Sequence, residues 1–266
     1  MTRFISLSSG SNGNCYYLGN EDCAILVDAG LSGRAVKKRL EENGLPIGAI
    51  RMILITHDHV DHIKCLGSIA ERLKVPIYAT KKVGAALYRN FSIGSHISGY
   101  LRTFEPGEHF ENFGVKSCSF EVPHDATQTV GYYIDFFGDK FLFATDLGEV
   151  TEDSVKYGRM CQHIVIESNY DVDMLVTGNY PPLLKTRIMN THGHLSNEQT
   201  AQYLKSVWCE GLKHVWLCHL SENNNTPEKA YASAYSALTE AGARVGEDVD
   251  LSCLPRYKAS GIFVME

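Results

Sequence analysis

The sequence predicts an α/β fold in which two packed sheets are covered by helices. The apolar runs are short, rich in β-branched residues and separated by turn residues, as expected of buried strands. Helical patterns lie between and after these runs, and a β-meander over residues 117–145 has helices on both sides in sequence. This order suits two sheets with outer helices better than one doubly wound parallel sheet.

The elements follow one another without low-complexity tracts, internal repeats or long linkers, so we predict a single domain over residues 1–266. The expected strands are Ala24–Asp28, Met52–Thr56, Val75–Ala79, Ser117–Val122, Thr129–Phe136, Lys140–Thr145, His163–Glu167 and His214–His219. The expected helices are Ser32–Asn43, Ile63–Leu73, Ser196 to about Val207, and Pro227–Ala241. Ser32 and Ser196 are typical helix caps, and Gln199 forms a capping box with Ser196.

A glycine-containing segment near the N-terminus raises the alternative of dinucleotide binding. A Rossmann fold places GxGxxG after the first strand and directly before a helix. Here the segment Ser8–Asn14 lies between Ile5 and Tyr16, and no helical pattern follows it. The sequence therefore argues against a dinucleotide site.

Charge and hydropathy narrow the class of protein further. The 25 Lys and Arg residues and 31 Asp and Glu residues give a net charge of −6. This balance does not suit a protein that coats nucleic acid non-specifically, although it is compatible with a local basic groove. No apolar run approaches membrane-spanning length, and the first ten residues lack the apolar segment of a signal peptide. We therefore expect a soluble, cytoplasmic protein without a membrane partner.

The clearest chemistry lies in the block THDHVDH, residues 56–62, which follows a predicted strand and leads into a helical pattern. His57, His59, Asp61 and His62 cannot all point one way on a continuous strand or helix. On a strand-to-helix turn they can surround a space wide enough for two cations. Imidazoles and a carboxylate suit zinc, manganese or iron. The alternative is a solvated loop in which His59 or His62 caps the helix, but HxHxDH at a strand end indicates a metal site.

Further metal-binding residue types follow in order along the chain. Asp28 in LVDAG, His124 in VPHDA, Asp146 in FATDLG and His219 in WLCHLS each come at or directly after a predicted strand, so all can lie at one rim of the fold. Together with the HxHxDH block, this order resembles the metallo-β-lactamase superfamily over most of the chain. The resemblance implies that family's αββα architecture, a four-layer sandwich with two packed mixed sheets.

The same resemblance implies a dinuclear metal site. It assigns His57, His59 and His124 to one ion, Asp61, His62 and His219 to the other, and Asp146 to both. Asp28 would orient the histidine block without binding a metal itself. Two cations roughly 3.5–4 Å apart can share a hydroxide and act on both the attacking and the leaving oxygen. The implied cofactors are two divalent ions, zinc or manganese. Iron is less expected, because flavodiiron members typically have a carboxylate where this chain has His59.

A second histidine-containing loop indicates the reaction class. The segment THGHLS, residues 191–196, opens a helical pattern. Phosphodiesterase members of the superfamily, such as the tRNA 3′-processing nucleases, have a similar loop whose histidine contacts the phosphate and protonates the leaving oxygen. By this resemblance His194 is the general acid and Glu167 in IVIESNYD orients it. We also predict that Asp61 is a catalytic residue. The alternatives are that His194 is a helix-capping polar residue and Glu167 a plain strand-end carboxylate.

A longer set of motifs identifies a branch of the superfamily. The motifs are SLSSGSNGNCYYL, THDHVDHI, VPHDA, ATDLG, ESNYD, GHLSN and CHLSENNN. Together they are similar to the YycJ-like (WalJ/VicX) bacterial branch over about the whole chain. That branch is associated with five-prime-to-three-prime DNA exonuclease activity and is often encoded with an essential cell-envelope two-component system. The resemblance therefore implies a DNA exonuclease and a functional link to such a system.

Candidate substrate contacts come from two kinds of segment. Ser9 and Asn12 belong to loop 8–14, which either offers small side chains and N–H groups near the metals or is an ordinary turn. The main basic segments are Lys37–Arg39, Lys81–Lys82 and the pair Lys185 and Arg187. Each can be a solvated face, but Lys185 and Arg187 are closest in sequence to His194 and are expected to contact phosphate.

Two other functions stay open at this point. The acidic net charge and the lack of a recognisable nucleic-acid module favour a small-molecule hydrolase acting on a cyclic phosphodiester or a thioester. A non-catalytic, metal-binding regulatory partner is the other alternative, but the full set of ligands and the candidate acid His194 argue against it. The oligomeric state cannot be derived from the sequence.

Overall fold

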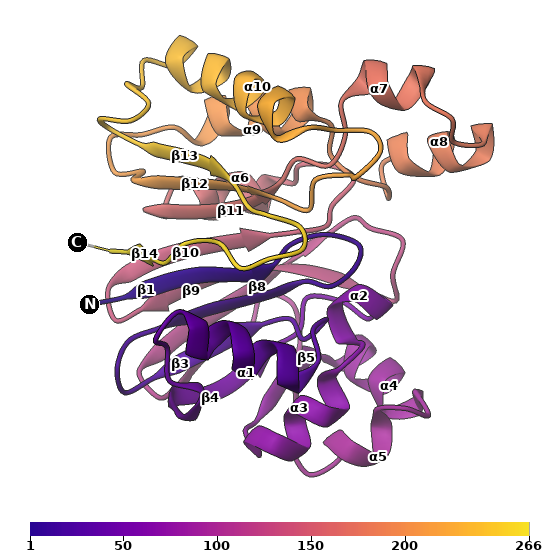
Figure 1. Cartoon of the computed structure of the whole chain (residues 1–266), viewed down its shortest axis with the longest axis vertical. Helices are drawn as coiled ribbons and strands as arrows, with labels where there is room; N and C mark the ends of the chain where they lie inside the picture. The colour runs from indigo at the N-terminus through magenta and orange to yellow at the C-terminus, as the bar shows by residue number, and fades with distance from the viewer. Residues whose placement is uncertain (266) are drawn as a thin grey trace. The chain divides into compact units, whose positions relative to one another are not determined.

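The computed structural model describes residues 1–265, and these form two compact units (Figure 1). The first unit comprises Met1–Gly114, Ala126–Gln128 and the residues from Pro255 onward. The second comprises Val115–Asp125 and Thr129–Leu254. This division does not decide the prediction of a single domain, which stays a prediction.

The sheet of the first unit has the strand order β14-β1-β2-β3-β4-β5-β6 among the described residues. Its strands are β1 (Arg3–Ser8), β2 (Cys15–Gly19), β3 (Ala24–Val27), β4 (Ile50–Leu54), β5 (Ile77–Thr80), β6 (Leu101–Phe104) and β14 (Phe263–Val264). From β14 to β3 the neighbours run antiparallel, and from β3 to β6 they run parallel. The sheet is therefore mixed.

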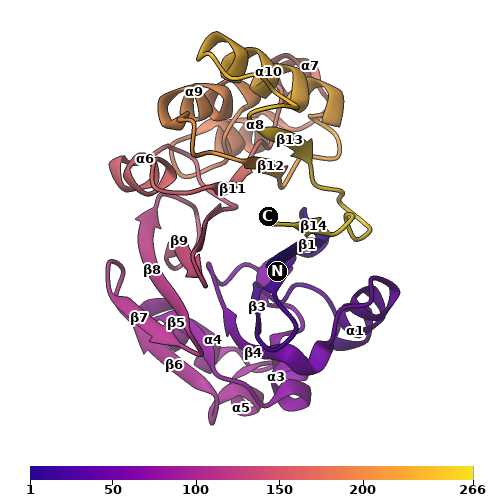
Figure 2. The same ribbon diagram turned by 90° about the vertical axis from the view of Figure 1, so that its left-hand side faces the viewer.

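Helices cover one face of this sheet, and Figure 2 shows α1 and α3 beside β3 and β4. The unit contains α1 (Gly33–Glu42), the 3₁₀ turn η1 (Ile47–Ala49), α2 (Val60–Ile63), α3 (Leu66–Leu73), α4 (Lys81–Arg89) and α5 (Gly94–Ile97). Leu40 of α1 and Leu66 of α3 join Leu26 and Ile53 of the strands in one buried apolar cluster. The expected cap is present, because the Ser32 hydroxyl accepts a hydrogen bond from the N–H of Ala35.

The second sheet has the strand order β13-β12-β11-β10-β9-β8-β7 among the described residues. Its strands are β7 (His109–Asn112), β8 (Val115–Val122), β9 (Thr129–Phe136), β10 (Asp139–Ala144), β11 (His163–Glu167), β12 (His214–Cys218) and β13 (Asp250–Cys253). β8, β9 and β10 form the predicted antiparallel meander, and β10 to β13 run parallel. This sheet is also mixed.

Helices of the second unit follow the strands that it contains. They are α6 (Glu152–Gly158), α7 (Val172–Thr177), α8 (Pro182–Met189), α9 (Asn197–Val207) and α10 (Pro227–Glu240). In Figure 1, α9 and α10 lie on one side of β11, β12 and β13. Leu204 and Leu238 of these helices pack in a buried cluster with Ile166 and Leu217 of the strands. The predicted capping box is present, with both hydrogen bonds between Ser196 and Gln199.

The prediction of two mixed sheets with helices is confirmed, but one helix boundary was wrong. The segment predicted as a single helix, Ile63–Leu73, is divided between α2 and α3. At the break, a residue distant in sequence binds the chain, because Ala29 donates its N–H to the carbonyl of His62 and accepts the N–H of Cys65. These backbone groups are therefore engaged outside the helix. The sequence also did not predict the strands β1, β2, β6, β7, β13 and β14 or the helices α4 to α8.

The described part of the chain contains no helix that could cross a membrane. Across residues 1–265, each helix is too short or too polar to cross a bilayer.

Candidate metal centre

The histidine loop, which we define as residues 55–62, connects the end of β4 to α2 in the first unit. β4 is buried along most of its length, so the direction in which the loop leaves the sheet is set by the core. His57 and His62 are fully buried, whereas His59 is partly exposed. His59 occupies the N-cap position of α2 but makes no side-chain cap hydrogen bond. The alternative role of His59 as a helix cap is therefore not supported.

Asp28 holds this loop from the neighbouring strand end. It follows β3, is fully buried and has a left-handed backbone, with φ of 61°. Its carboxylate accepts hydrogen bonds from the backbone N–H of Thr56 at 2.9 Å and from the Nδ1 of His62 at 2.7 Å. The Thr56 hydroxyl lies 2.9 Å from the same carboxylate and 3.0 Å from the Nδ1 of His57. Asp28 thus orients the loop, as a carboxylate behind a metal-binding histidine does.

The donor atoms at the end of this loop fit a small divalent cation. Because Nδ1 of His62 donates to Asp28, coordination by His62 would use Nε2. That nitrogen lies 3.5 Å from Oδ2 of Asp61. Two ligand atoms bound at about 2.1 Å with a tetrahedral angle lie about 3.4 Å apart. Asn14 contacts the same two atoms, since its Nδ2 lies 3.1 Å from Asp61 Oδ2 and 2.9 Å from His62 Nε2, so its amide would have to move aside for a cation to bind Nε2.

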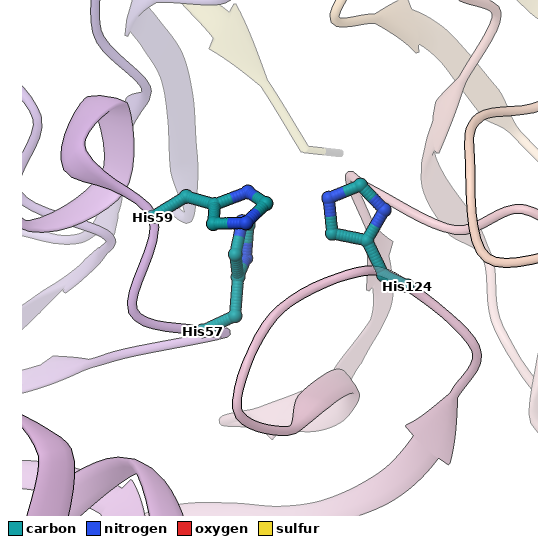
Figure 3. A group of neighbouring side chains, drawn as sticks. All are labelled: His57, His59 and His124. Carbon is teal, nitrogen blue, oxygen red and sulfur yellow. The ribbon is translucent and has the colours of Figure 1, made fainter. Parts of the chain in front are cut away.

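His57 and His59 bring two more imidazoles to the same loop (Figure 3). The ring centroid of His57 lies 4.8 Å from that of His59 and 4.0 Å from that of His62. Three imidazoles and one carboxylate therefore lie within residues 57–62. This is a borderline donor set of the kind that zinc, manganese and iron prefer.

The second unit contains a cluster that we call the Glu167 cluster, made of Asp146, Glu167, His194 and His219. Each member can offer one ligand atom such that all four atoms lie within 4.8 Å of one another. Asp146 follows β10, Glu167 ends β11, and His219 follows β12. The carboxyl ends of parallel strands lie at one edge of a sheet, so this grouping follows from the topology.

Glu167 is the centre of this cluster. It is fully buried, and its Oε1 accepts hydrogen bonds from the Nδ1 of His194 at 2.7 Å and of His219 at 2.8 Å. Its Oε2 accepts the backbone N–H groups of Leu147 at 3.2 Å and Leu195 at 3.1 Å. One carboxylate therefore fixes two imidazole rings and joins the loops that follow β10 and precede α9. Any coordination by His219 would use its Nε2.

The protonation states that Glu167 and His194 favour follow from their burial and from the charges around them. Burial is the largest influence on the pKa of Glu167 and would raise it, but the charge of His194 and the hydrogen bonds from His194 and His219 lower it overall. Burial would also lower the pKa of His194, yet the charge and hydrogen bond of Glu167 outweigh it and raise that pKa. The pair thus favours an ionised carboxylate beside a protonated imidazole, as a proton donor requires.

His124 lies in the loop after β8 (Figure 3). The loop that carries His194 holds it in place. Its Nδ1 donates to the carbonyl of Gly193 at 2.8 Å, and its Nε2 lies 4.0 Å from Oδ1 of Asp146. Burial lowers the pKa of His124, which favours the neutral imidazole that a metal ligand must have. Gly193 has to be glycine, because an added Cβ would come within 2.1 Å of the carbonyl oxygen of Ile188.

The predicted substrate-binding residues lie in different environments. Ser9 is buried, and its hydroxyl lies 2.9 Å from that of Tyr16, while Asn12 is exposed. Lys185 donates to the carbonyl of Val176 at 2.7 Å. Arg187 pairs with Asp125, the residue after His124, at 2.5 Å. Their roles in binding stay predictions.

Several positioning residues were missed by reasoning from the sequence. Asn14 contacts Asp61 and His62 through its side-chain amide, and Asn169 donates to the carbonyl of His219 at 2.8 Å. Asn225 donates to the carbonyl of Ser168 and to the Oδ1 of Asn197. The sequence places Asn14 in loop 8–14 and Asn169 two residues after Glu167, but no local pattern in it indicates these hydrogen bonds.

Comparison with known proteins agrees with this geometry. A model of the β-lactamase superfamily domain matches residues 24–219. The chain is 37% identical over 254 residues to exodeoxyribonuclease YycJ of Bacillus anthracis, covering 93% of each protein. It is 34% identical over 247 residues to exodeoxyribonuclease WalJ of Streptococcus pneumoniae, covering 92% of this chain and 91% of that protein.

A similar fold occurs in Zn²⁺-bound PqqB from Methylobacterium extorquens, with a TM-score of 0.70 over 97% of this chain and 99% of that one. At 16% identity this likeness concerns the fold alone. The family match, the sequence identity and the strand-end donor sets lead to one conclusion. The chain belongs to the metallo-β-lactamase superfamily of metal-dependent hydrolases and, within it, to the branch that contains YycJ and WalJ.

Proposed function

We propose that this protein is a metal-dependent exonuclease that hydrolyses DNA from the five-prime end. The names of the YycJ and WalJ relatives support DNA as the substrate. The observation that carries the proposal is the pairing of His194 with Glu167. His194 donates to a fully buried carboxylate at 2.7 Å, while 22% of its own side chain is exposed. A phosphodiester needs such a partly accessible acid, because its leaving alkoxide must be protonated.

We further propose that the ligands divide as the family resemblance implies. The division assigns His57, His59 and His124 to one ion, Asp61, His62 and His219 to the other, and Asp146 to both. Divalent ions, when bound, supply Lewis-acid chemistry for hydrolysis. The 3.5 Å spacing of the Asp61 and His62 donor atoms and the neutral state favoured for His124 fit this role.

The residues of the chain itself then handle the proton. Glu167 holds the Nδ1 of His194, so the opposite nitrogen, Nε2, would deliver the proton to the leaving oxygen. The raised pKa of His194 keeps that proton in place until the leaving oxygen gains charge. Glu167 also holds His219, so the proton donor and a proposed ligand share one support.

The test compares His194→Ala with His192→Ala, an exposed histidine two positions earlier in the same loop. Each protein is reconstituted with zinc or manganese and assayed on linear DNA labelled at its five-prime or three-prime end. We expect His194→Ala to keep its metal and to lose about 10²–10⁴ in kcat, with a smaller loss on bis(p-nitrophenyl) phosphate, whose leaving group is a weak base. His192→Ala should match the parent protein.

The same assay separates the alternatives. Early release of the five-prime label, with sealed circular duplex resistant, supports the proposed polarity and end requirement. Activity confined to a cyclic phosphodiester, an acyl thioester or nitrocefin would replace it with a small-molecule hydrolase. Failure on every substrate despite bound metal would favour a regulatory partner. The cytoplasmic location and the link to a two-component system stay predictions.

A further inference from the structure

Four of the seven cations in the basic segments expected from the sequence are paired with acidic residues. Lys37 and Lys38 pair with the acidic residues four positions later in α1, at 3.3 and 3.7 Å. Lys81 pairs with Glu105 at 3.1 Å, and Arg187 with Asp125. Clustering of cations in the sequence is therefore a poor guide to where unpaired positive charge gathers on this protein.

Four other cations of the first unit, from three separate parts of the sequence, line a shared surface. One hollow of about 500 Å³ contains Arg34 and Arg72, and a second of about 380 Å³ contains Arg51, Arg72 and Lys74. Because Arg72 lines both, the hollows adjoin. We call these four residues the basic strip. Among residues 1–265, the ion pairs within 4.0 Å do not involve any of the four.

Among the residues that line the two hollows, the acidic one is engaged elsewhere. Glu71 lines the first hollow, but its carboxylate lies 2.5 Å from the Nδ1 of His96. Arg51 is anchored by the backbone carbonyls of Gly48 and Asp22, so its position is fixed while its charge is not neutralised by a carboxylate. In a chain of net charge −6, this is a local concentration of positive charge.

An exposed aromatic ring borders the second hollow. Phe113 is 51% exposed, and its backbone is left-handed with φ of 54°. It forms, with Gly114, the two-residue turn between β7 and β8. Both turn residues have positive φ, the geometry for which Asn-Gly is preferred and in which a bulky residue is strained. A phenylalanine is thus presented to solvent beside cations, at a local energetic cost.

The strip extends away from the histidine loop. The first hollow includes Ser32, shortly after Asp28, and the second includes Ile50 at the start of β4. The five residues of β4, at about 3.3 Å each, span about 17 Å between that start and the histidine loop. A ligand that contacted both the strip and the histidine loop would have to be long, and the cations of the strip favour one with negative charge.

We propose that the basic strip and Phe113 bind a single-stranded segment of nucleic acid, with phosphates against the cations and a base stacked on the phenyl ring. This combination of a positive groove and a stacking ring is how single strands are bound without sequence preference. The inference rests on the proposed nucleic-acid substrate and extends it to a second contact region on the first unit.

The aromatic part is tested with Phe113→Asn and the matched control Phe137→Asn. Phe137 also precedes a glycine, has φ of 54° and is 54% exposed, but it does not line the hollow. Asn tolerates this backbone, so both variants should fold. Binding of a fluorescent oligothymidylate is measured by anisotropy in a chelator, where no cleavage occurs. We expect Phe113→Asn to weaken binding at least about fivefold and Phe137→Asn to leave it unchanged.

An abasic oligomer with the same phosphates separates stacking from charge. Phe113→Asn should not change the affinity for it. Equal losses on both oligomers, or equal losses for both Asn variants, would overturn the stacking contact.

The charged part is tested with Arg72→Gln/Lys74→Asn against Lys37→Gln/Lys38→Gln, which removes the same net charge. Each phosphate contact contributes about 0.7 to the salt slope of single-strand binding, so the strip variant should lower that slope by about 1.4. The control pair should leave it unchanged. Equal slopes for the two variants, or tighter binding of polyaspartate than of the oligomer, would overturn the assignment.

Activity of the metal-loaded protein distinguishes this inference from the exonuclease proposal. The strip variant should raise KM for a long single strand and spare bis(p-nitrophenyl) phosphate. If DNA is degraded but the strip variant binds like the parent, the inference fails and the exonuclease proposal stands. If binding depends on the strip but DNA is not degraded, the inference stands and the exonuclease proposal fails.

Discussion

Replacing His163 should make the second unit less sensitive to acid. His163 is the first residue of β11, the strand that ends at Glu167, and it is 4% exposed. Its ring centroid lies 4.4 Å from that of Phe141, and its Nδ1 lies 3.0 Å from the Nδ1 of His214. Burial, aided by His214, lowers the pKa of His163 from the ordinary 6.5 to about 3.

The sign and size of the effect follow from proton linkage. Between pH 6.5 and 3 the unfolded chain holds a proton on this ring and the folded chain does not, so the free energy of unfolding falls as the pH falls. The slope approaches about 1.4 kcal/mol per pH unit. From pH 7.5 to pH 5 this one residue should therefore cost about 2 kcal/mol of stability.

The assay is urea unfolding of the parent protein, His163→Phe and His163→Asn at both pH values, in a chelator so that metal release does not contribute. Trp208 and Trp216, the two tryptophans of the chain, both lie in the second unit and report its unfolding. The two replacements will differ in absolute stability, because only Phe fills the apolar site. Neither titrates, so both should reduce the pH-dependent loss by about 2 kcal/mol.

Two results would refute this reasoning. An unchanged loss between pH 7.5 and 5 in both variants would mean that His163 is not held neutral in the folded state. A reduced loss in only one of them would mean that packing, rather than titration, causes the effect.

Three further predictions concern the proposed metal site and its support. Asp146→Ala should lose most of two bound metal equivalents, as measured by elemental analysis after reconstitution, and retention of both would contradict a bridging role. Asp28→Asn removes the negative charge of the side chain that accepts a hydrogen bond from His62, so the affinity for zinc, measured by competition with a chelator, should fall about 10- to 100-fold. An unchanged affinity would mean that Asp28 does not orient the loop. Asn225→Ala leaves the carbonyls of Ser168 and Asn169 without their side-chain donor, so thermal unfolding should show a loss of about 2–4 kcal/mol. A loss under about 0.5 kcal/mol would mean that these hydrogen bonds contribute little to the stability of the protein.

The sequence was sufficient for features that depend on near neighbours in the chain. Ser32 and Ser196 cap helices because a hydroxyl reaches backbone N–H groups within three residues. The placing of His124, Asp146 and His219 just after strands was also predictable, since apolar runs end where polar residues begin.

Features that depend on distant partners could not be derived in this way. β1 pairs with β14, so that Phe4 lies opposite Phe263, and no local pattern encodes that register. The predicted helix 63–73 is interrupted near its start, where Ala29, more than thirty residues earlier, accepts the N–H of Cys65 and donates its own N–H to the carbonyl of His62. One continuous helix and two shorter helices both fit the local helical pattern of this segment.

The charged residues show most clearly which features the sequence determines and which the fold determines. The sequence by itself determined which residues are cations, and that the chain carries the complete order of histidines and carboxylates typical of its superfamily. Only the tertiary structure decided that Lys37 and Lys38 are neutralised by partners while Arg34, Arg51, Arg72 and Lys74 share one surface. It also decided that a single carboxylate, Glu167, holds two histidines. The physical reason is that electrostatic interaction depends on distance in space and on burial, which the fold sets and sequence spacing does not.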